Sequence, residues 1–374
     1  MAKVSTAQRF EAAAICAPGL EVICSQELRA LGVKPKTAGP GTVEFSANAR
    51  QLYAANVWLR TATRVVARIA TFRATDFLHL QERAAEVDWS PWLGDGVAPA
   101  FRISTNESKL YHTGAIAQRL HQIVGAPSIG EPEQLFVVRI ERNTVSISAD
   151  TSGEALNRRP WRTEVGDAPL RTTMAAAIVL AAEWDPGTSL VDPFCGVGTI
   201  AIEAALLARN RPPGGLRPFA FQTWPGFEPG TWASVTGQVA AAEGVDRTVT
   251  ISASDRDGTA IAAAQANAER AGVSDDIEFT KQVVSHLRAR QGPGLVVTNP
   301  PYGRRVGDGR LDGLYRRLGT VARERLPGHG LAIVCPDAKL AATVDGRLRS
   351  IARFRHGGLG VQLFSLPPPL AAEA

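Results

Sequence analysis

The sequence is poor in cysteine and lacks long apolar runs. Its four cysteines, Cys16, Cys24, Cys195 and Cys335, form no C-x-x-C pair, and its six histidines do not cluster with them. This spacing indicates neither a disulfide framework nor a zinc site, so we expect no bound metal and a reducing, cytoplasmic setting. No apolar run is long enough to cross a bilayer, and residues 1–5 do not resemble a signal peptide, so a membrane protein is not expected.

Positive charge is in modest excess and unevenly distributed. The 374 residues are 45% hydrophobic and carry a formal net charge of +5, which is enough chain for two or three domains with their own cores. Residues 302–374 hold 12 Lys or Arg against 6 Asp or Glu, whereas residues 166–301 hold 10 against 14. Clustered arginines favour phosphate contacts. A solvated helix face over residues 311–326 is the alternative for any single arginine there.

The stiffest local pattern is Asn299-Pro300-Pro301-Tyr302-Gly303, directly after an apolar run. The prolines hold the chain extended and offer no competing N–H groups. The Asn299 side-chain oxygen and the Pro300 carbonyl can then accept both N–H groups of an exocyclic base amine and aim its lone pair at an electrophile. Tyr302 offers a flat face for a base, a contact worth about 1–3 kcal/mol. A proline-rich turn with an exposed tyrosine is the structural alternative.

A second pattern, residues 189–199, predicts a strand, a Gly-rich turn and a helix. Gly196 and Gly198 let the backbone approach a ligand closely. Asp192 before the glycines favours a cation over a pyrophosphate, and the next acidic strand end, Asp255, lies 59 residues after Gly196. A nicotinamide-binding unit has that acid after about 20 residues. One carboxylate for a cation and one for ribose hydroxyls fit S-adenosylmethionine.

In the N-terminal part, apolar patterns predict an α+β arrangement. We expect strands near residues 10–16, 42–45, 65–70 and 100–104, helices over 20–31 and 50–61, and a helix ending near 124. Two further runs, 136–141 and 144–148, predict a hairpin that turns at Arg142-Asn143. Strand–helix–strand spacing this short indicates a small α+β sandwich.

The two C-terminal patterns together resemble class I S-adenosylmethionine-dependent methyltransferases that modify amino groups, because the Gly-rich loop, the ribose acid and N-P-P-Y follow in that order. The N-terminal half makes the similarity specific to THUMP-containing methyltransferases, and it extends over roughly residues 10–364. The segments that carry it are 58–62, 108–114, 150–156 and 158–162. Within this family the chain is most similar to the bacterial 23S ribosomal RNA guanine-N2 methyltransferases.

This resemblance implies a fold and an activity. It implies a Rossmann-like α/β methyltransferase domain over residues 157–374. Residues 1–156 would form an α+β ferredoxin-like piece plus a THUMP RNA-binding domain, with the THUMP core at about 45–152. The implied reaction moves a methyl group from S-adenosylmethionine to the exocyclic N2 amine of guanine in structured RNA. The expected RNA is 23S ribosomal RNA, and transfer RNA is the alternative.

The resemblance also implies site residues. The motif positions expected to bind S-adenosylmethionine are Asp192, Phe194, Gly196, Gly198, Thr199, Asp255, Arg256, Gln282, Leu170 and Arg171. The positions expected to contact RNA are Lys109, Arg158, Arg159, Arg304 and Arg305. Asn299, Pro300 and Tyr302 would act on the target base.

A long insert between the Gly-rich helix and Asp255 favours the ribosomal branch over the transfer RNA branch. Its aromatic residues, Phe219, Phe221, Trp224 and Trp232, suit either an RNA platform or a small satellite core. The sequence leaves both interpretations open.

Three positions depart from the family pattern. Val197 stands where a small polar residue is common, Gln282 where many relatives have an acid for the adenine amine, and Arg304 where an acid often follows Tyr-Gly. These departures keep open an RNA-binding assembly factor with weak or lost catalysis. Adenine-N6 DNA methyltransferases and the glutamine methyltransferases of release factors also carry N-P-P-Y. The former should have a DNA-recognition domain, and the latter lack a THUMP part.

Overall fold

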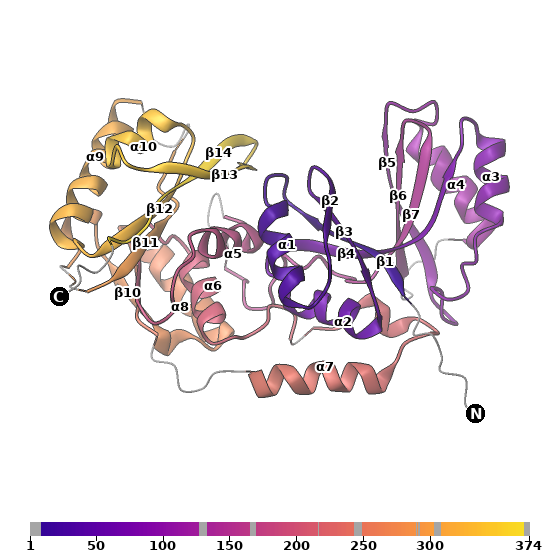
Figure 1. Cartoon of the computed structure of the whole chain (residues 1–374), viewed down its shortest axis with the longest axis horizontal. Coiled ribbons are helices and arrows are strands. Elements are labelled where there is room, and N and C mark those ends of the chain that lie inside the picture. Colours follow the sequence, from indigo (N-terminus) through magenta and orange to yellow (C-terminus); the bar gives the residue numbers. More distant parts are fainter. Residues whose placement is uncertain are drawn as a thin grey trace. The chain divides into compact units, whose positions relative to one another are not determined.

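The computed structural model describes residues 9–126, 133–164, 170–215, 217–242, 249–288, 290, 292–302 and 308–369 (Figure 1). The chain divides into two compact units. The first contains the described residues up to 16, from 24 to 156 and from 217 to 238, and the second contains the remainder. Within the described ranges, no helix is both long and apolar enough to span a membrane.

The first unit is built on one seven-stranded sheet with the order β2-β3-β1-β4-β7-β6-β5. The strands are β1 (Phe10–Cys16), β2 (Lys36–Gly39), β3 (Thr42–Ala47), β4 (Ala62–Arg73), β5 (Ala98–Asn106), β6 (Glu133–Glu141) and β7 (Thr144–Asp150). The helices are α1 (Glu21–Ala30), α2 (Ala49–Trp58), α3 (Phe77–Ala85) and α4 (Thr113–Val124). β5 and β6 run parallel and the other neighbours antiparallel, so the N-terminal α+β pieces share one continuous sheet.

Local patterns predicted most of these elements, with three differences. The predicted hairpin is confirmed, because Arg142 and Asn143 both adopt positive φ angles, 48° and 65°, as a two-residue hairpin turn requires. The helix predicted over 50–61 ends earlier, at Trp58, since Leu59 is already extended. Two elements were not predicted: β2, a four-residue edge strand, and α3, which begins after an Asp76 side-chain cap.

The aromatic insert (residues 217–238) packs as part of the first unit. It contains η1 (Ala220–Thr223) and most of α7 (Pro229–Ala242). Phe221 is fully buried and stacks on Tyr53 of α2 with ring centroids 4.2 Å apart. Trp224 contacts Trp92 edge-on at 4.7 Å. Phe221 and Trp224 therefore belong to a small satellite core, and the prediction of an RNA platform is wrong for these two buried rings.

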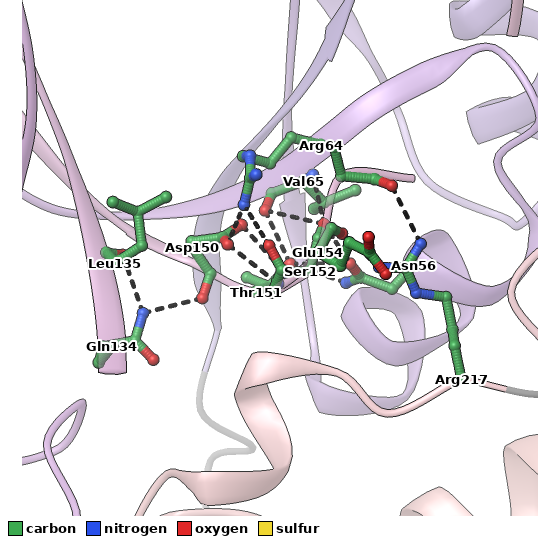
Figure 2. A network of polar contacts seen from close by, with 12 residues as sticks. Asn56, Arg64, Val65, Gln134, Leu135, Asp150, Thr151, Ser152, Glu154 and Arg217 are labelled. Atoms are coloured by element: carbon green, nitrogen blue, oxygen red, sulfur yellow. Dashed lines mark hydrogen bonds and ion pairs between the residues drawn. The ribbon is translucent and has the colours of Figure 1, made fainter. Parts of the chain in front are cut away.

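A buried polar network fixes the segment after β7 (Figure 2). The Asp150 carboxylate pairs with Arg64 and accepts the backbone N–H groups of Ser152 and Gly153 at 3.0 and 2.9 Å. Asn56 donates to Thr151 at 2.8 Å and accepts from Ser152 at 2.7 Å. Residues 150–152, which carry part of the family resemblance, are therefore buried and serve the fold, whereas Gly153 is exposed.

The same network holds the aromatic insert. Arg217 donates to the backbone carbonyls of Glu154 and Ala155 (Figure 2). The Trp224 indole N–H donates to the Gln134 side-chain oxygen at 2.7 Å, and Gln134 in turn donates to the Asp150 carbonyl at 2.9 Å. Because both side chains are buried, each polar group depends on the other for its hydrogen bond.

Trp224→Phe should therefore destabilise the first unit by about 1–3 kcal/mol, since it leaves the buried Gln134 oxygen without its donor. Urea unfolding would measure the loss. Trp232→Phe is the matched control, because this half-buried ring packs on Tyr53 and Phe219 at the edge of the same cluster. A Trp224 variant no less stable than the Trp232 variant would contradict the role given to this hydrogen bond.

The second unit has a seven-stranded sheet with the order β10-β9-β8-β11-β12-β14-β13. The strands are β8 (Ser189–Asp192), β9 (Ile251–Asp255), β10 (Ile277–Lys281), β11 (Gly294–Thr298), β12 (His329–Cys335), β13 (Arg349–His356) and β14 (Leu359–Leu366). The first five strands in this order, β10 to β12, run parallel to one another, and β14 runs antiparallel to both of its neighbours. Every residue of β11 and β12 is buried, as expected for central parallel strands covered on both faces.

Helices cover both faces of this sheet (Figure 1). α5 (Thr172–Ala181) packs on α6 (Thr199–Ala208), which contacts α8 (Gly258–Ala271), and α9 (Asp308–Arg325) packs on α10 (Ala338–Val344). The core on the α9 and α10 side contains Val296, Tyr315 and Ile333. The fold is the predicted Rossmann-like methyltransferase architecture, with parallel strands that all end at one edge.

Candidate active site

The predicted motifs converge at the carboxyl ends of the parallel strands. Asp192 ends β8, Asp255 ends β9, Gln282 follows β10 and Asn299 follows β11. β8 has β9 on one side and β11 on the other, so the strand order reverses direction there. In open α/β sheets ligands bind in the crevice at such a point.

The Gly-rich turn is shaped by its two glycines and tied to β9. Gly196 and Gly198 have φ angles of 53° and 80°, and Gly198 is the N-cap of α6. A Cβ on Gly198 would come within 3.0 Å of Ala264, whereas one on Gly196 would meet no described atom within 4 Å. The Gly196 N–H donates to the Asp255 carboxylate at 3.0 Å. The turn therefore presents open backbone at Gly196, while Thr199 is buried at the start of the helix.

Asp192 is a buried carboxyl with one oxygen held and one not. Its Oδ1 accepts the Thr298 hydroxyl at 2.6 Å and the Phe194 N–H at 3.2 Å. Among the described residues nothing hydrogen-bonds to its buried Oδ2. Burial, together with a smaller contribution from the nearby Asp255 charge, raises the pKa of Asp192 to about 7, although the Thr298 and Phe194 hydrogen bonds oppose the shift. A cation beside Oδ2 would favour the ionised carboxylate.

The Asn-Pro-Pro-Tyr motif begins where β11 ends. The Asn299 Oδ1 atom is buried, and no hydrogen bond reaches it from the part of the chain that the structure describes. Pro300 is buried, and Pro301 and Tyr302 are half-buried. Because Thr298 immediately precedes Asn299 and donates to Asp192, one hydrogen bond links this motif to the Gly-rich turn. Two unsatisfied buried oxygens therefore lie near the ends of adjacent strands.

Asp255 is oriented by the backbone on both sides. Its two oxygens accept the N–H groups of Gly196 and Asp257, each at 3.0 Å. Its own carbonyl accepts the Gln282 N–H at 2.9 Å, which places Gln282, half-buried, beside the end of β9. Arg256 is exposed. This geometry leaves carboxylate lone pairs that can accept ribose hydroxyls.

The other predicted site residues occupy varied environments. Leu170 is buried and Arg171 is the exposed N-cap residue of α5, while Lys109 and Arg158 are exposed. The prediction that Arg159 contacts RNA is wrong, because its side chain is buried and its Nε lies 3.0 Å from the buried Glu203 carboxylate. That ion pair keeps its guanidinium inside the protein and away from RNA. Arg304 and Arg305 lie outside the described residues.

Two polar residues of this region were missed by sequence reasoning. Thr298 ends the apolar run before Asn299, and a hydroxyl at a strand end beside an acidic strand end is a detectable signal. His356, at the end of β13, lies 2.6 Å from the Tyr302 hydroxyl through its Nδ1. The two residues are 54 positions apart, so no local pattern could have revealed this contact.

The cysteines do not supply a nucleophile here. All four are buried and free. Burial raises the pKa of the Cys335 thiol to about 11 and raises the pKa of Cys195 well above its usual value. A thiol with such a pKa is not ionised at neutral pH. Among the described residues, no three His, Cys, Asp or Glu side chains gather in a way that could hold a metal ion.

Residues 159–354 match the family described as RMKL-like, methyltransferase domain, and residues 11–66 match the RlmL ferredoxin-like domain. YpsC of Bacillus subtilis (strain 168), provisionally named an RNA methyltransferase, is 34% identical over 315 residues, which cover 80% of this chain and 81% of YpsC. The ribosomal RNA large subunit methyltransferase K/L of Methylococcus capsulatus is 32% identical over 365 residues, which cover 92% of this chain and 50% of that protein.

A solved structure agrees with these matches. SMU.472, provisionally described as a methyltransferase and crystallised in complex with SAH, has a TM-score of 0.87 and 28% identity over 97% of this chain and 99% of that one. The matches confirm the predicted methyltransferase fold and the ferredoxin-like N-terminal piece. The THUMP core at about 45–152 stays a prediction.

Proposed function

Because this chain belongs to the family of RMKL-like methyltransferases, we propose that it transfers a methyl group from S-adenosylmethionine to the exocyclic N2 amine of a guanine in structured RNA. We further propose 23S ribosomal RNA as that RNA. The name of the Methylococcus relative, which acts on the large ribosomal subunit RNA, supports this choice. The present chain spans half of that relative's length, so the assignment concerns only the activity of the matched half.

The residues at the strand ends fit S-adenosylmethionine. The Oδ2 atom of Asp192, to which no described residue hydrogen-bonds, suits the cofactor's ammonium group, and the open backbone at Gly196 permits close approach. Asp255 and Gln282, joined by the hydrogen bond from the Gln282 N–H to the Asp255 carbonyl, would take the ribose hydroxyls and the adenine amine. When bound, the cofactor supplies an electrophilic methyl group on a sulfonium. The protein's task is then to orient the amine that attacks it.

The single observation that carries the proposal is the buried Oδ1 of Asn299, which has no hydrogen-bond partner among the described residues. The following prolines provide no N–H that could satisfy it. A target amine that donates to this oxygen and to the Pro300 carbonyl would have its lone pair aimed in a fixed direction. Both oxygens would also stabilise the positive charge that develops on the amine. Tyr302 would stack on the base once it has been flipped out of its helix.

Labelled methyl transfer to ribosomal RNA and transfer RNA in parallel, followed by nucleoside analysis, tests the proposal. We expect N2-methylguanosine in large-subunit ribosomal RNA. The same nucleoside in transfer RNA alone would keep the chemistry and overturn the substrate. Label in neither RNA, despite measurable cofactor binding, would favour an assembly factor or a different substrate class.

A further inference from the structure

The β13–β14 hairpin closes the second sheet next to the target-base motif and is strongly basic on one face. Residues 349–366 contain three arginines and no Asp or Glu. β13 is the edge strand of the sheet, because within the described part of the chain β14 alone pairs with it. The buried face includes Phe354, which pairs with Val361, and the alternate positions Arg353 and Arg355 are exposed.

His356 at the end of this arginine-bearing strand reaches Tyr302. Its Nδ1 lies 2.6 Å from the Tyr302 hydroxyl, and the two rings meet edge-on with centroids 6.1 Å apart. Tyr302 is only half-buried, and it follows two prolines that fix the backbone but not the ring. A hydrogen bond to the end of the ring restricts its rotation about Cα–Cβ.

We propose that the β13–β14 hairpin is an RNA-binding element that couples phosphate contact to the orientation of Tyr302. Arg353 and Arg355 bind backbone phosphates of the RNA that carries the target base, and His356 is a positioning residue that holds the Tyr302 ring ready to stack. This inference rests on the proposed function and deepens it by assigning the surface that holds the substrate.

Three features select RNA as the partner of this face. The arginines are spaced two residues apart on one side of an edge strand, which suits successive contacts along a phosphate backbone. The face carries no acidic side chain of its own. It is also continuous, through His356, with the residue proposed to receive the base. An acidic protein partner would use the same charges but would not need the link to Tyr302.

The phosphate contact is tested first by removing charge. The double variant Arg353→Ala/Arg355→Ala should raise the KM for 23S ribosomal RNA about tenfold and leave kcat close to the wild-type value. The slope of log affinity against log salt should become shallower by about 0.7–0.9 per lost contact. Arg288→Ala, an exposed arginine on the segment that leads to the start of β11, is the matched control. An unchanged KM and salt slope in the double variant would overturn the RNA surface.

The positioning role is tested by a double-mutant cycle. His356→Ala should lower kcat about tenfold with little change in KM, and His356→Asn should recover most of it because its amide can replace Nδ1. In a Tyr302→Phe background, His356→Ala should cost nothing more, since the hydroxyl is already gone. Additive losses, or no recovery by asparagine, would overturn the coupling.

Failure of the proposed function is distinguishable from failure of this inference. If the wild-type protein methylates no RNA, the proposed function fails. RNA binding measured by fluorescence anisotropy would then still test the arginine face. Thermal unfolding of the Tyr302→Phe, His356→Ala and double variants would still test the Tyr302–His356 hydrogen bond. Non-additive unfolding midpoints and weakened RNA binding would support the inference, while additive midpoints or unchanged binding would refute it.

Discussion

Replacing Asn299 with alanine should lower turnover at least 100-fold while the affinities for RNA and for S-adenosylmethionine stay close to wild type. The loss follows from the geometry at the end of β11. The Asn299 Oδ1 atom is buried and has no partner within the described chain, so its hydrogen-bonding capacity is reserved for a donor that arrives with the substrate. Removing one preorganised polar group from such a site costs about 10²–10³ in rate.

The matched control is Asn299→Asp, which keeps an acceptor oxygen in nearly the same volume. It should retain more turnover than the alanine variant, although a buried carboxylate is costly and would reduce it below wild type. Single-turnover methyl transfer would rank the three proteins, and RNA binding by anisotropy would confirm that the surface is intact. An alanine variant that keeps more than a tenth of the wild-type rate would refute the amine-orienting role.

Local patterns in the sequence predicted the residues at the strand ends. A Gly-rich turn after a short apolar strand and an Asn-Pro-Pro-Tyr run after another are both local, so they identify Asp192, Gly196 and Asn299 without knowledge of the fold. The βα alternation then implies parallel strands whose carboxyl ends meet at one edge. The structure brings these residues to that edge.

Residues held by partners far along the chain were not predictable in this way. The Arg159–Glu203 pair joins positions 44 apart, and an arginine in a basic run looks exposed until its buried partner is known. The aromatic insert looked like a candidate RNA surface because its partner, Tyr53, lies far upstream in α2. The solvent exposure of a side chain depends on residues that are distant in sequence, so local composition alone cannot predict it.

Asp192→Asn should stabilise the protein without cofactor and at the same time abolish tight cofactor binding. The pKa of Asp192 is about 7 in the folded protein, against 3.8 for an ordinary aspartate. Between those values the folded protein keeps a proton that the unfolded chain has released, so wild-type stability falls as pH rises through this window. Asparagine does not titrate and avoids that loss. This difference in pKa corresponds to about 4 kcal/mol in the free energy of unfolding. The amide N–H of asparagine, buried without a partner, subtracts about 1–3 kcal/mol from that gain. The net gain at pH 8 is on the order of 2 kcal/mol.

Cofactor binding should respond to pH in the opposite sense. A cationic ligand beside Asp192 needs the ionised carboxylate, so wild-type affinity for S-adenosylmethionine should rise between pH 6 and pH 8, and the asparagine variant should bind weakly at both. Thr298→Val sharpens the test, because losing the hydroxyl that donates to Oδ1 raises the pKa of Asp192 further. Its affinity should therefore rise only at higher pH. Calorimetry at several pH values, paired with urea unfolding, measures both effects. A wild-type affinity independent of pH would show that Asp192 does not serve a cation, and an asparagine variant less stable than wild type at pH 8 would refute the raised pKa of Asp192.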